Sequence, residues 1–281
     1  GGARRAAHEP GLGGRRAMKE VLVEIADPVA LIRLNRPDKL NALTYPMLDE
    51  LRRAVDAAAS NPAVVGIVIT GEGRGFCSGL DAAVLEQTTK GNVPRARAKG
   101  AEIPGLFTYL LDVPKPVIAA VNGVAAGGGF VLAALCDVRF ASTAASFTSI
   151  FTKRGLVAEH GTSWIVPRLV GVGRALDLLW TSRRIDAAEA QRIGLVEYVV
   201  QPDALVSAAS AYVAELASTV SPEALADTKR MVYAHAGLGY PEALRDVDEV
   251  QWRAVARSDA REGANALLER RPPRFARLGA K

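Results

Sequence analysis

The sequence has few cysteines and lacks long apolar runs, so it is not typical of a disulfide-rich or membrane protein. Only two of its 281 residues are cysteines, Cys77 and Cys136. Two thiols are too few for a disulfide framework or a cysteine-rich metal site, so we expect both to be small buried hydrophobes. No run approaches the roughly 20 apolar residues needed to cross a bilayer. No apolar signal core follows the N-terminal arginines. These absences predict a cytoplasmic protein with no membrane partner.

A basic stripe is also missing from the body of the chain. The formal net charge is +5, but residues 1–17 carry +3 and residues 270–281 carry +5, which leaves −3 on the remainder. Nucleic-acid recognition requires basic residues gathered on one surface and interleaved with aromatics. We therefore expect no nucleic-acid partner.

No Ser/Gly/Pro-rich linker divides the middle of the chain, although 281 residues could form two domains. The composition, 49% hydrophobic and 23% charged, is ordinary for a globular protein. We predict one α/β core over residues 18–200 and a C-terminal helical region over 201–281. Residues 1–17 open with Gly-Gly and lack a pattern, which indicates a disordered extension or an expression remnant.

Strands and helices alternate through the first two-thirds of the chain, which predicts an α/β fold. Thr44 can cap a helix that carries Pro46 in its first turn and stops at Ser60-Asn61-Pro62. Asp186 and Glu189 have capping-box spacing, and Gly194 stands where that helix would end. We expect strands at 21–25, 30–34, 64–70, 116–121, 138–141 and 195–200.

Helices are expected in four further segments, 103–111, 203–217, 222–236 and 241–257. The glycine-rich residues 127–129 open another helix. Residues 82–102 are polar and weakly periodic, so we interpret them as a mobile segment beside the site.

Two glycine-rich turns follow buried strands, at 71–81 and at 127–129. Glycine lets a backbone N–H approach a ligand closely, and a helix N-terminus adds partial positive charge. Two such amides that converge form an oxyanion hole, worth about 3–4 kcal/mol per donor. Close helix–strand packing is the alternative. Nucleotide loops fit poorly because the dinucleotide spacing and the phosphate-loop lysine are missing, and Ser78 lies in GFCSG instead of G-x-S-x-G.

These residues resemble the crotonase (enoyl-CoA hydratase/isomerase) superfamily. The likeness rests on RGFCSGLD (74–81), PKPVIAAVNGVAAGGG (114–129), LCD (135–137), NRPDKLNALT (35–44) and EGANALLERRPPRFA (262–276). The resemblance implies a crotonase-like ββα superhelix with a C-terminal helical trimerisation region. It also implies a homotrimer or a dimer of trimers, and a role in fatty acid metabolism.

Carried over by position, the oxyanion donors fall on the N–H groups of Leu80 and Gly128. Coenzyme A would lie along residues 39–42 and 79–83 as part of an acyl-CoA substrate, with no tightly bound cofactor and no metal. The implied substrate-binding residues are Lys39, Leu40, Ala42, Ser78, Gly79, Leu80, Asp81, Ala82, Gly128, Val131 and Phe151.

The two glutamates typical of a hydratase in this family are absent. Val131 and Phe151 occupy their positions, and neither can carry a proton. The nearest carboxylate is Glu159 in RGLVAEHGTSW, a segment similar to the acidic loop of some enoyl-CoA isomerases. We predict Glu159 as the single acid–base group, shielded by apolar neighbours. His160 either assists or orients it, or is a surface or structural residue, as a lone histidine more often is. The alternative is that Glu159 caps the helix that starts near Gly161.

The sequence therefore predicts an enoyl-CoA hydratase or isomerase that stabilises a thioester enolate. A rival hypothesis is a non-catalytic acyl-CoA-binding scaffold that kept the glycine turns. A serine hydrolase that uses Ser78, Ser149 or Ser163 is a weaker one.

Overall fold

A sheet with one antiparallel and four parallel strand pairings organises the core. The protein is represented by a computed structural model, which describes residues 19–90 and 104–279. Within that part, six strands pair in the order β1-β2-β3-β5-β7-β10, of which only β1 and β2 are antiparallel. They are β1 (Val21–Ala26), β2 (Val29–Leu34), β3 (Gly66–Gly71), β5 (Val117–Val121), β7 (Val138–Ser142) and β10 (Tyr198–Val200).

Four very short strands build a second sheet in the order β4-β6-β8-β9. They are β4 (Gly75–Cys77), β6 (Val124–Ala126), β8 (Ser146–Thr148) and β9 (Ile185–Asp186). Three times the chain leaves the larger sheet, adds a short strand to the smaller one and continues into helix. This ββα repeat makes the superhelix and confirms the predicted fold class. Two or three residues are too few for a sequence pattern, so these strands were not predicted.

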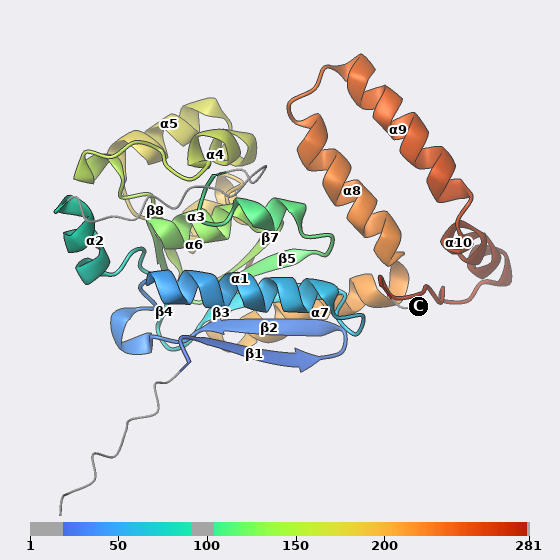
Figure 1. Ribbon diagram of the computed structural model, residues 1–281, viewed down its shortest axis with the longest axis horizontal. Coiled ribbons are helices and arrows are strands. Elements are labelled where there is room, and N and C mark those ends of the chain that lie inside the picture. The colour runs from blue at the N-terminus through green and yellow to red at the C-terminus, as the bar shows by residue number, and fades with distance from the viewer. Residues whose placement is uncertain (1–18, 91–103, 280–281) are drawn as a thin grey trace, which may run out of the picture.

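Helices cover both faces of the larger sheet (Figure 1). α1 (Tyr45–Ser60) and α3 (Gly128–Leu135) share a core with Ile67 and Ile69, whereas α7 (Leu205–Thr219) packs with Val68. Successive residues of β3 are buried on opposite faces, as a central parallel strand requires.

Local signals set the predicted helix ends. The Thr44 hydroxyl accepts the Met47 N–H at 3.1 Å, and α1 begins one residue after that cap. Asp186 accepts the Glu189 N–H at 2.8 Å and starts α6 (Ala187–Arg192), while Gly194 adopts φ 84° beyond its end. Both caps confirm the sequence interpretation.

Two predicted segments differ from the structure. Residues 82–89, expected to be mobile, form α2 (Ala82–Thr89), while 91–102 lie outside the described residues. The helix expected at 103–111 is the five-residue 3₁₀ turn η2 (Thr108–Asp112). Pro114 and Pro116 follow closely, and proline restricts the residue before it to extended backbone, so a longer α-helix has no room.

The C-terminal helices form an arm that stands apart from the sheets (Figure 1). It consists of α8 (Pro222–His235), α9 (Tyr240–Val255) and α10 (Ser258–Glu269). α7, α8 and α9 confirm the three helical segments predicted after residue 202, and α10 was not predicted. Within the described residues, no single helix has the length and hydrophobicity of a membrane span. Only a sharply bent pair, residues 202–219 (η4, Pro202–Ala204, with α7) and 222–235 (α8), meets that criterion together.

Candidate functional site

The first glycine turn is fixed by backbone pairing with the loop that precedes α1. The N–H of Leu43 donates to Gly79 O at 2.7 Å, and the N–H of Asp81 donates to Leu43 O at 2.9 Å. Leu43 is thus hydrogen-bonded to the two residues on either side of Leu80. Because groups alternate in direction along an extended backbone, the N–H of Leu80 points away from Leu43.

The second turn ends at the start of α3. Gly127 is the N-cap at φ 52°, and Gly128 is the first helical residue, so its N–H has no intrahelical acceptor. Among the described residues, neither this N–H nor that of Leu80 has a recorded hydrogen-bond partner. Both amides are therefore available to a ligand.

The two turns lie directly against one another. A Cβ atom added to Gly79 would lie 2.9 Å from Ala126 O and 3.4 Å from Gly128 N. Gly79 also adopts φ 94°, which a side chain disfavours. Glycine is therefore required at position 79 by both backbone conformation and space. Close packing of the two turns, which was the alternative to an oxyanion hole, also brings their amides together, so both explanations hold for this contact.

Apolar side chains surround these turns. Leu43 Cδ1 lies 2.8 Å, and Leu106 Cδ1 3.8 Å, from the point where Gly128 would carry a Cβ. Ile150 reaches the equivalent point of Gly127 at 3.2 Å and has φ 61°, a strained conformation for a β-branched residue. A polar group bound here is shielded from water on these sides.

Val131 and Phe151 belong to the hydrophobic core. Val131 is fully buried on α3, and Phe151 is 5% exposed before η3 (Thr152–Arg154). The Thr152 hydroxyl donates to Leu179 O and Trp180 O, which ties this segment to α5 (Val172–Thr181). Their core packing supports the view that neither position supplies acid–base chemistry.

Glu159 lies on a tight turn beside His160. The Glu159 side chain is 31% exposed, so the expected apolar shielding is incomplete, and His160 Nε2 is 3.4 Å from Glu159 Oε2. Burial lowers the pKa of His160, and the charge of Glu159 opposes that shift. Thr162 donates to Glu159 O through its N–H at 3.0 Å and its hydroxyl at 2.8 Å.

The capping role considered for Glu159 is wrong. α4 (Thr162–Val170) has Gly161 as its N-cap, and no side chain caps it. The Glu159 backbone carbonyl holds the turn while its carboxylate stays outside the cap. The carboxylate contacts His160 and is not engaged as a helix cap.

The predicted coenzyme A loops lie side by side. Ser78 N donates to Leu40 O at 3.0 Å, and the Ser78 hydroxyl donates to Lys39 O at 3.2 Å. The side chains of Lys39 and Ala82 are exposed, whereas Ala42 is buried. Lys39 can therefore reach an anionic ligand, and Ala42 is placed to line the site only through its backbone.

Asp81 holds the first glycine turn in place through an ion pair and a backbone hydrogen bond. Its carboxylate accepts the Ala83 N–H at 3.0 Å and pairs with Arg36 at 2.9 Å. These contacts, the backbone bond first, lower the pKa of Asp81. A carboxylate so engaged stabilises the start of α2 and the first glycine turn.

Sequence reasoning missed Asn41, which organises the loop before α1. Asn41 is fully buried at φ 56°, donates to Glu72 O and Gly75 O at 3.0 and 2.8 Å, and accepts the Arg36 N–H. The available signal was an Asn in the turn-prone NRPDKLN, because Asn tolerates the left-handed region.

The serine hydrolase hypothesis finds no support in the described residues. The Ser149 hydroxyl contacts Leu178 O and Ser182, and that of Ser78 contacts Lys39 O. Histidine contacts recorded there are those of His160 with Glu159 and His235 with Asp246. No serine–histidine pair is therefore present in residues 19–90 and 104–279.

The thiols are packed into the core, as predicted. Cys77 and Cys136 are both buried, and burial raises the pKa of each to about 12. A thiol with such a pKa is a poor nucleophile. Over the same described ranges, no three His, Cys, Asp or Glu side chains cluster as a metal site.

Comparisons with known proteins identify a matching family. The model of the family described as "Enoyl-CoA hydratase/isomerase" matches residues 24–277. A crotonyl-CoA hydratase of Syntrophomonas wolfei is 35% identical over 262 residues, which cover 92% of this chain and 98% of that protein.

Solved structures are similar over most of both chains. Enoyl-CoA hydratase from Mycobacterium tuberculosis H37Rv has a TM-score of 0.83 at 30% identity and covers 93% of this chain and 99% of its own. Enoyl-CoA hydratase from Bacillus anthracis has a TM-score of 0.83 at 29% identity, covering 93% and 100%.

Proposed function

Because this chain belongs to the enoyl-CoA hydratase/isomerase family, we propose that Leu80 and Gly128 bind the thioester oxygen of an unsaturated acyl-CoA while Glu159 moves a proton. The observation that carries the proposal is the contact between Gly79 and Gly128, whose turns hold the two unpartnered amides. Charge that develops on the oxygen would be stabilised by about 3–4 kcal/mol per donor.

One carboxylate suffices for either reaction of the family. In isomerisation, Glu159 removes an α-proton from a 3-enoyl-CoA, the electrons delocalise into the thioester, and the proton returns at the γ-carbon. In hydration, Glu159 takes a proton from water as the hydroxyl adds to the β-carbon, and the proton returns at the α-carbon. The names of the similar proteins favour hydration.

Substitution of Glu159 tests the assignment. Glu159→Gln keeps the shape of the side chain but removes the base, so kcat on 2-enoyl-CoA and 3-enoyl-CoA is expected to fall by about 100-fold or more. Binding of free coenzyme A, measured by calorimetry, is expected to stay unchanged. Glu215→Gln, an exposed glutamate on α7, is the matched control and should keep full activity.

Two other outcomes would change the conclusion. Equal turnover by the Glu159→Gln variant would remove Glu159 from the mechanism. Absence of wild-type turnover on any enoyl-CoA, with coenzyme A still bound, would favour the non-catalytic scaffold. The scaffold hypothesis is supported by a specific observation: buried Val131 and Phe151 replace both glutamates that are usual in the family.

The proposed assembly is a homotrimer or a dimer of trimers. Its support is the exposed apolar surface of the arm, where Trp252, Leu267 and Leu268 are 63%, 79% and 81% exposed. Apolar surface of this kind is typical of a protein–protein interface. A cytoplasmic location, a role in fatty acid metabolism, and the absence of a tightly bound cofactor remain parts of this proposal.

A further inference from the structure

A cavity of about 710 Å³ lies between the body of the protein and its C-terminal arm. Its walls come from residues 104–114, the end of α3 at Leu135, the start of α4 at Gly161 and Trp164, and one side of α8. Cavities of this size hold small molecules or parts of larger ligands. None of the predicted substrate-binding residues lines it.

The free surface of the cavity is hydrocarbon in character. Three of the four charged residues that line it are paired: Lys229 with Asp137 at 2.7 Å, Arg230 with Asp246 at 3.0 Å and Asp227 with Arg257 at 2.6 Å. The fourth is Asp112. The apolar side chains that line the cavity include those of Leu111, Val113, Leu135, Trp164 and Ala226. A hydrocarbon chain would gain by burial here without displacing an ion from its partner.

Three segments lead from the glycine turns to this cavity. α3 runs from Gly128 to Leu135, a rise of about 10 Å. Leu106 touches the site at Gly128, while Pro104 and Thr108 on either side of it line the cavity. The turn that carries Glu159 continues directly into Gly161 and Trp164. An acyl chain whose thioester oxygen binds at the turns has the cavity within its reach.

Trp164 forms a fixed wall of the cavity. The Arg168 guanidinium lies 4.1 Å from the centroid of its indole ring and also donates to Ala236 O at the end of α8. The hydrogen bond to Ala236 connects α4 to the arm, and the cation–π contact holds the indole against the same guanidinium. Ala226, on α8, also lines the cavity, and its small side chain leaves space.

We infer that this cavity receives the distal part of the substrate's acyl chain, which makes the enzyme selective for medium- to long-chain acyl-CoA. The inference rests on the proposed function and adds the substrate class to it. Trp164 and Ala226 are the specificity-determining residues: the indole limits the depth of the cavity, and the alanine keeps its width.

Binding of saturated thioesters tests the inference without turnover. Each buried methylene group contributes about fourfold in affinity, so wild type is expected to bind decanoyl-CoA more tightly than butanoyl-CoA. Ala226→Trp fills the cavity and should lower the decanoyl preference by about tenfold or more, with butanoyl-CoA affinity unchanged. Ala224→Trp, an exposed alanine on the same helix outside the cavity, is the matched control and should leave both affinities unchanged.

Two results would overturn the inference: an unchanged preference in Ala226→Trp, or an equal loss in both alanine variants. If Ala226→Trp does not fold, Trp164→Ala decides, because a deeper cavity should raise the preference for dodecanoyl-CoA over decanoyl-CoA, and an unaltered ratio refutes the idea. Chain-length preference without enoyl-CoA turnover would refute the proposed reaction and keep the cavity assignment.

Discussion

At the scale of single residues, the site depends on unusual backbone conformations. Asn41, Gly79, Gly127, Ile150 and His160 all have positive φ and lie around the two glycine turns or the Glu159 turn. In Ile150 and His160 this conformation costs free energy, and it persists because neighbouring contacts hold it, whereas glycine adopts it freely and asparagine tolerates it. Strain concentrated at the site is consistent with amides held in place before a substrate binds.

His160 gives this part of the protein a pH-dependent stability. Burial lowers its pKa from the ordinary 6.5, so the folded state binds fewer protons than the unfolded state in mildly acidic solution. Stability is therefore full above pH 6.5 and is lost as the pH falls toward the lowered pKa. Between about pH 8 and about pH 5, the urea midpoint of wild type is expected to fall more than that of His160→Asn. Asn suits the left-handed conformation, and parallel losses in both proteins would contradict this account.

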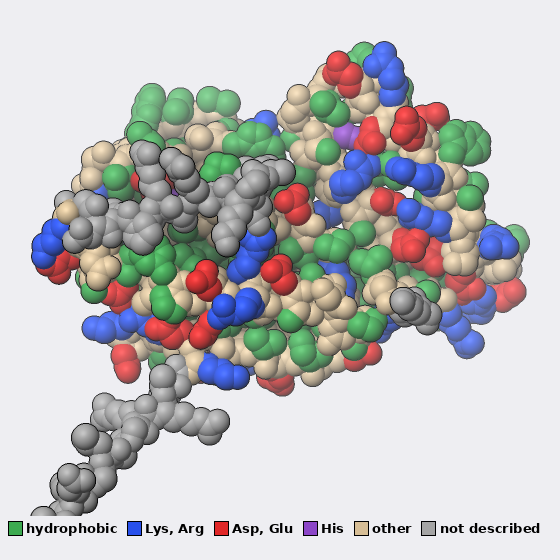
Figure 2. All heavy atoms as spheres, in the orientation of Figure 1, with side chains coloured by type: hydrophobic (Ala, Val, Ile, Leu, Met, Phe, Trp, Pro, Cys, Tyr) green, Lys and Arg blue, Asp and Glu red, His purple; other side chains and the backbone are tan. Residues whose placement is uncertain are grey.

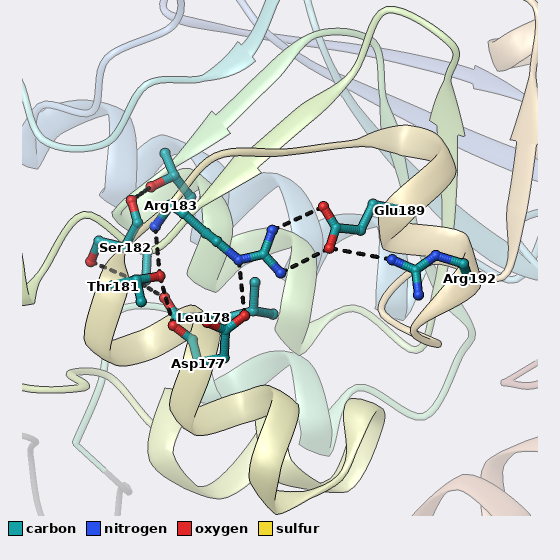
Figure 3. Close-up of polar contacts among 9 residues, drawn as sticks. Asp177, Leu178, Thr181, Ser182, Arg183, Glu189 and Arg192 are labelled. Atoms are coloured by element: carbon teal, nitrogen blue, oxygen red, sulfur yellow. Dashed lines mark hydrogen bonds and ion pairs between the residues drawn. The ribbon is translucent and has the colours of Figure 1, made fainter.

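At the scale of elements, helices are held in place by buried or networked charges. Arg183 follows α5 and pairs with Asp177 at 2.8 Å and with Glu189 of α6 at 2.8 and 2.9 Å, and Arg192 extends the network (Figure 3). α8 is attached differently. Lys229 donates to Asp137 at 2.7 Å and to Leu110 O, and Tyr233 donates to the same carboxylate at 2.9 Å. The first network is the more exposed, and the second is partly buried.

Removal of Lys229 is therefore expected to weaken the attachment of the arm. Lys229 is 9% and Asp137 16% exposed, so the pair is partly buried, and the loss of one partner is expected to cost less than the about 3–5 kcal/mol of a fully buried pair. Lys229→Met should lower the urea midpoint markedly, and adding Asp137→Asn should recover part of the loss. Arg192→Met, at a 68% exposed side chain, is the control with no measurable change. Equal midpoints for the two single variants would contradict the anchoring role.

At the scale of the whole molecule, the arm separates from the compact α/β body and exposes apolar side chains (Figure 1). The face drawn in Figure 2 shows Lys and Arg intermixed with Asp and Glu rather than gathered into a basic stripe. Leu267 and Leu268 on α10 and Trp180 on α5 are largely exposed. A monomer would leave this surface in water, so a neighbouring copy is its expected cover.

Charges on the arm are expected to prevent assembly. Leu267→Glu combined with Leu268→Glu places two carboxylates where an interface would be apolar. Light scattering should give wild type a mass three or six times the 29.7 kDa of the chain, and the variant the mass of one chain. Ala211→Glu, at an exposed position on α7, should assemble normally. A monomeric wild type would refute the trimer.

The sequence by itself determined the α/β alternation, the caps at Thr44 and Asp186, and the absence of acid–base side chains at positions 131 and 151. These depend on local propensity or on residue identity, which a pattern records directly. Only the tertiary structure decided that Gly79 touches Gly128 and that Leu43 flanks Leu80. The short strands of the second sheet and the cavity beneath α8 also required it. Such features arise from packing between segments distant along the chain, and no local pattern encodes the distances that packing sets.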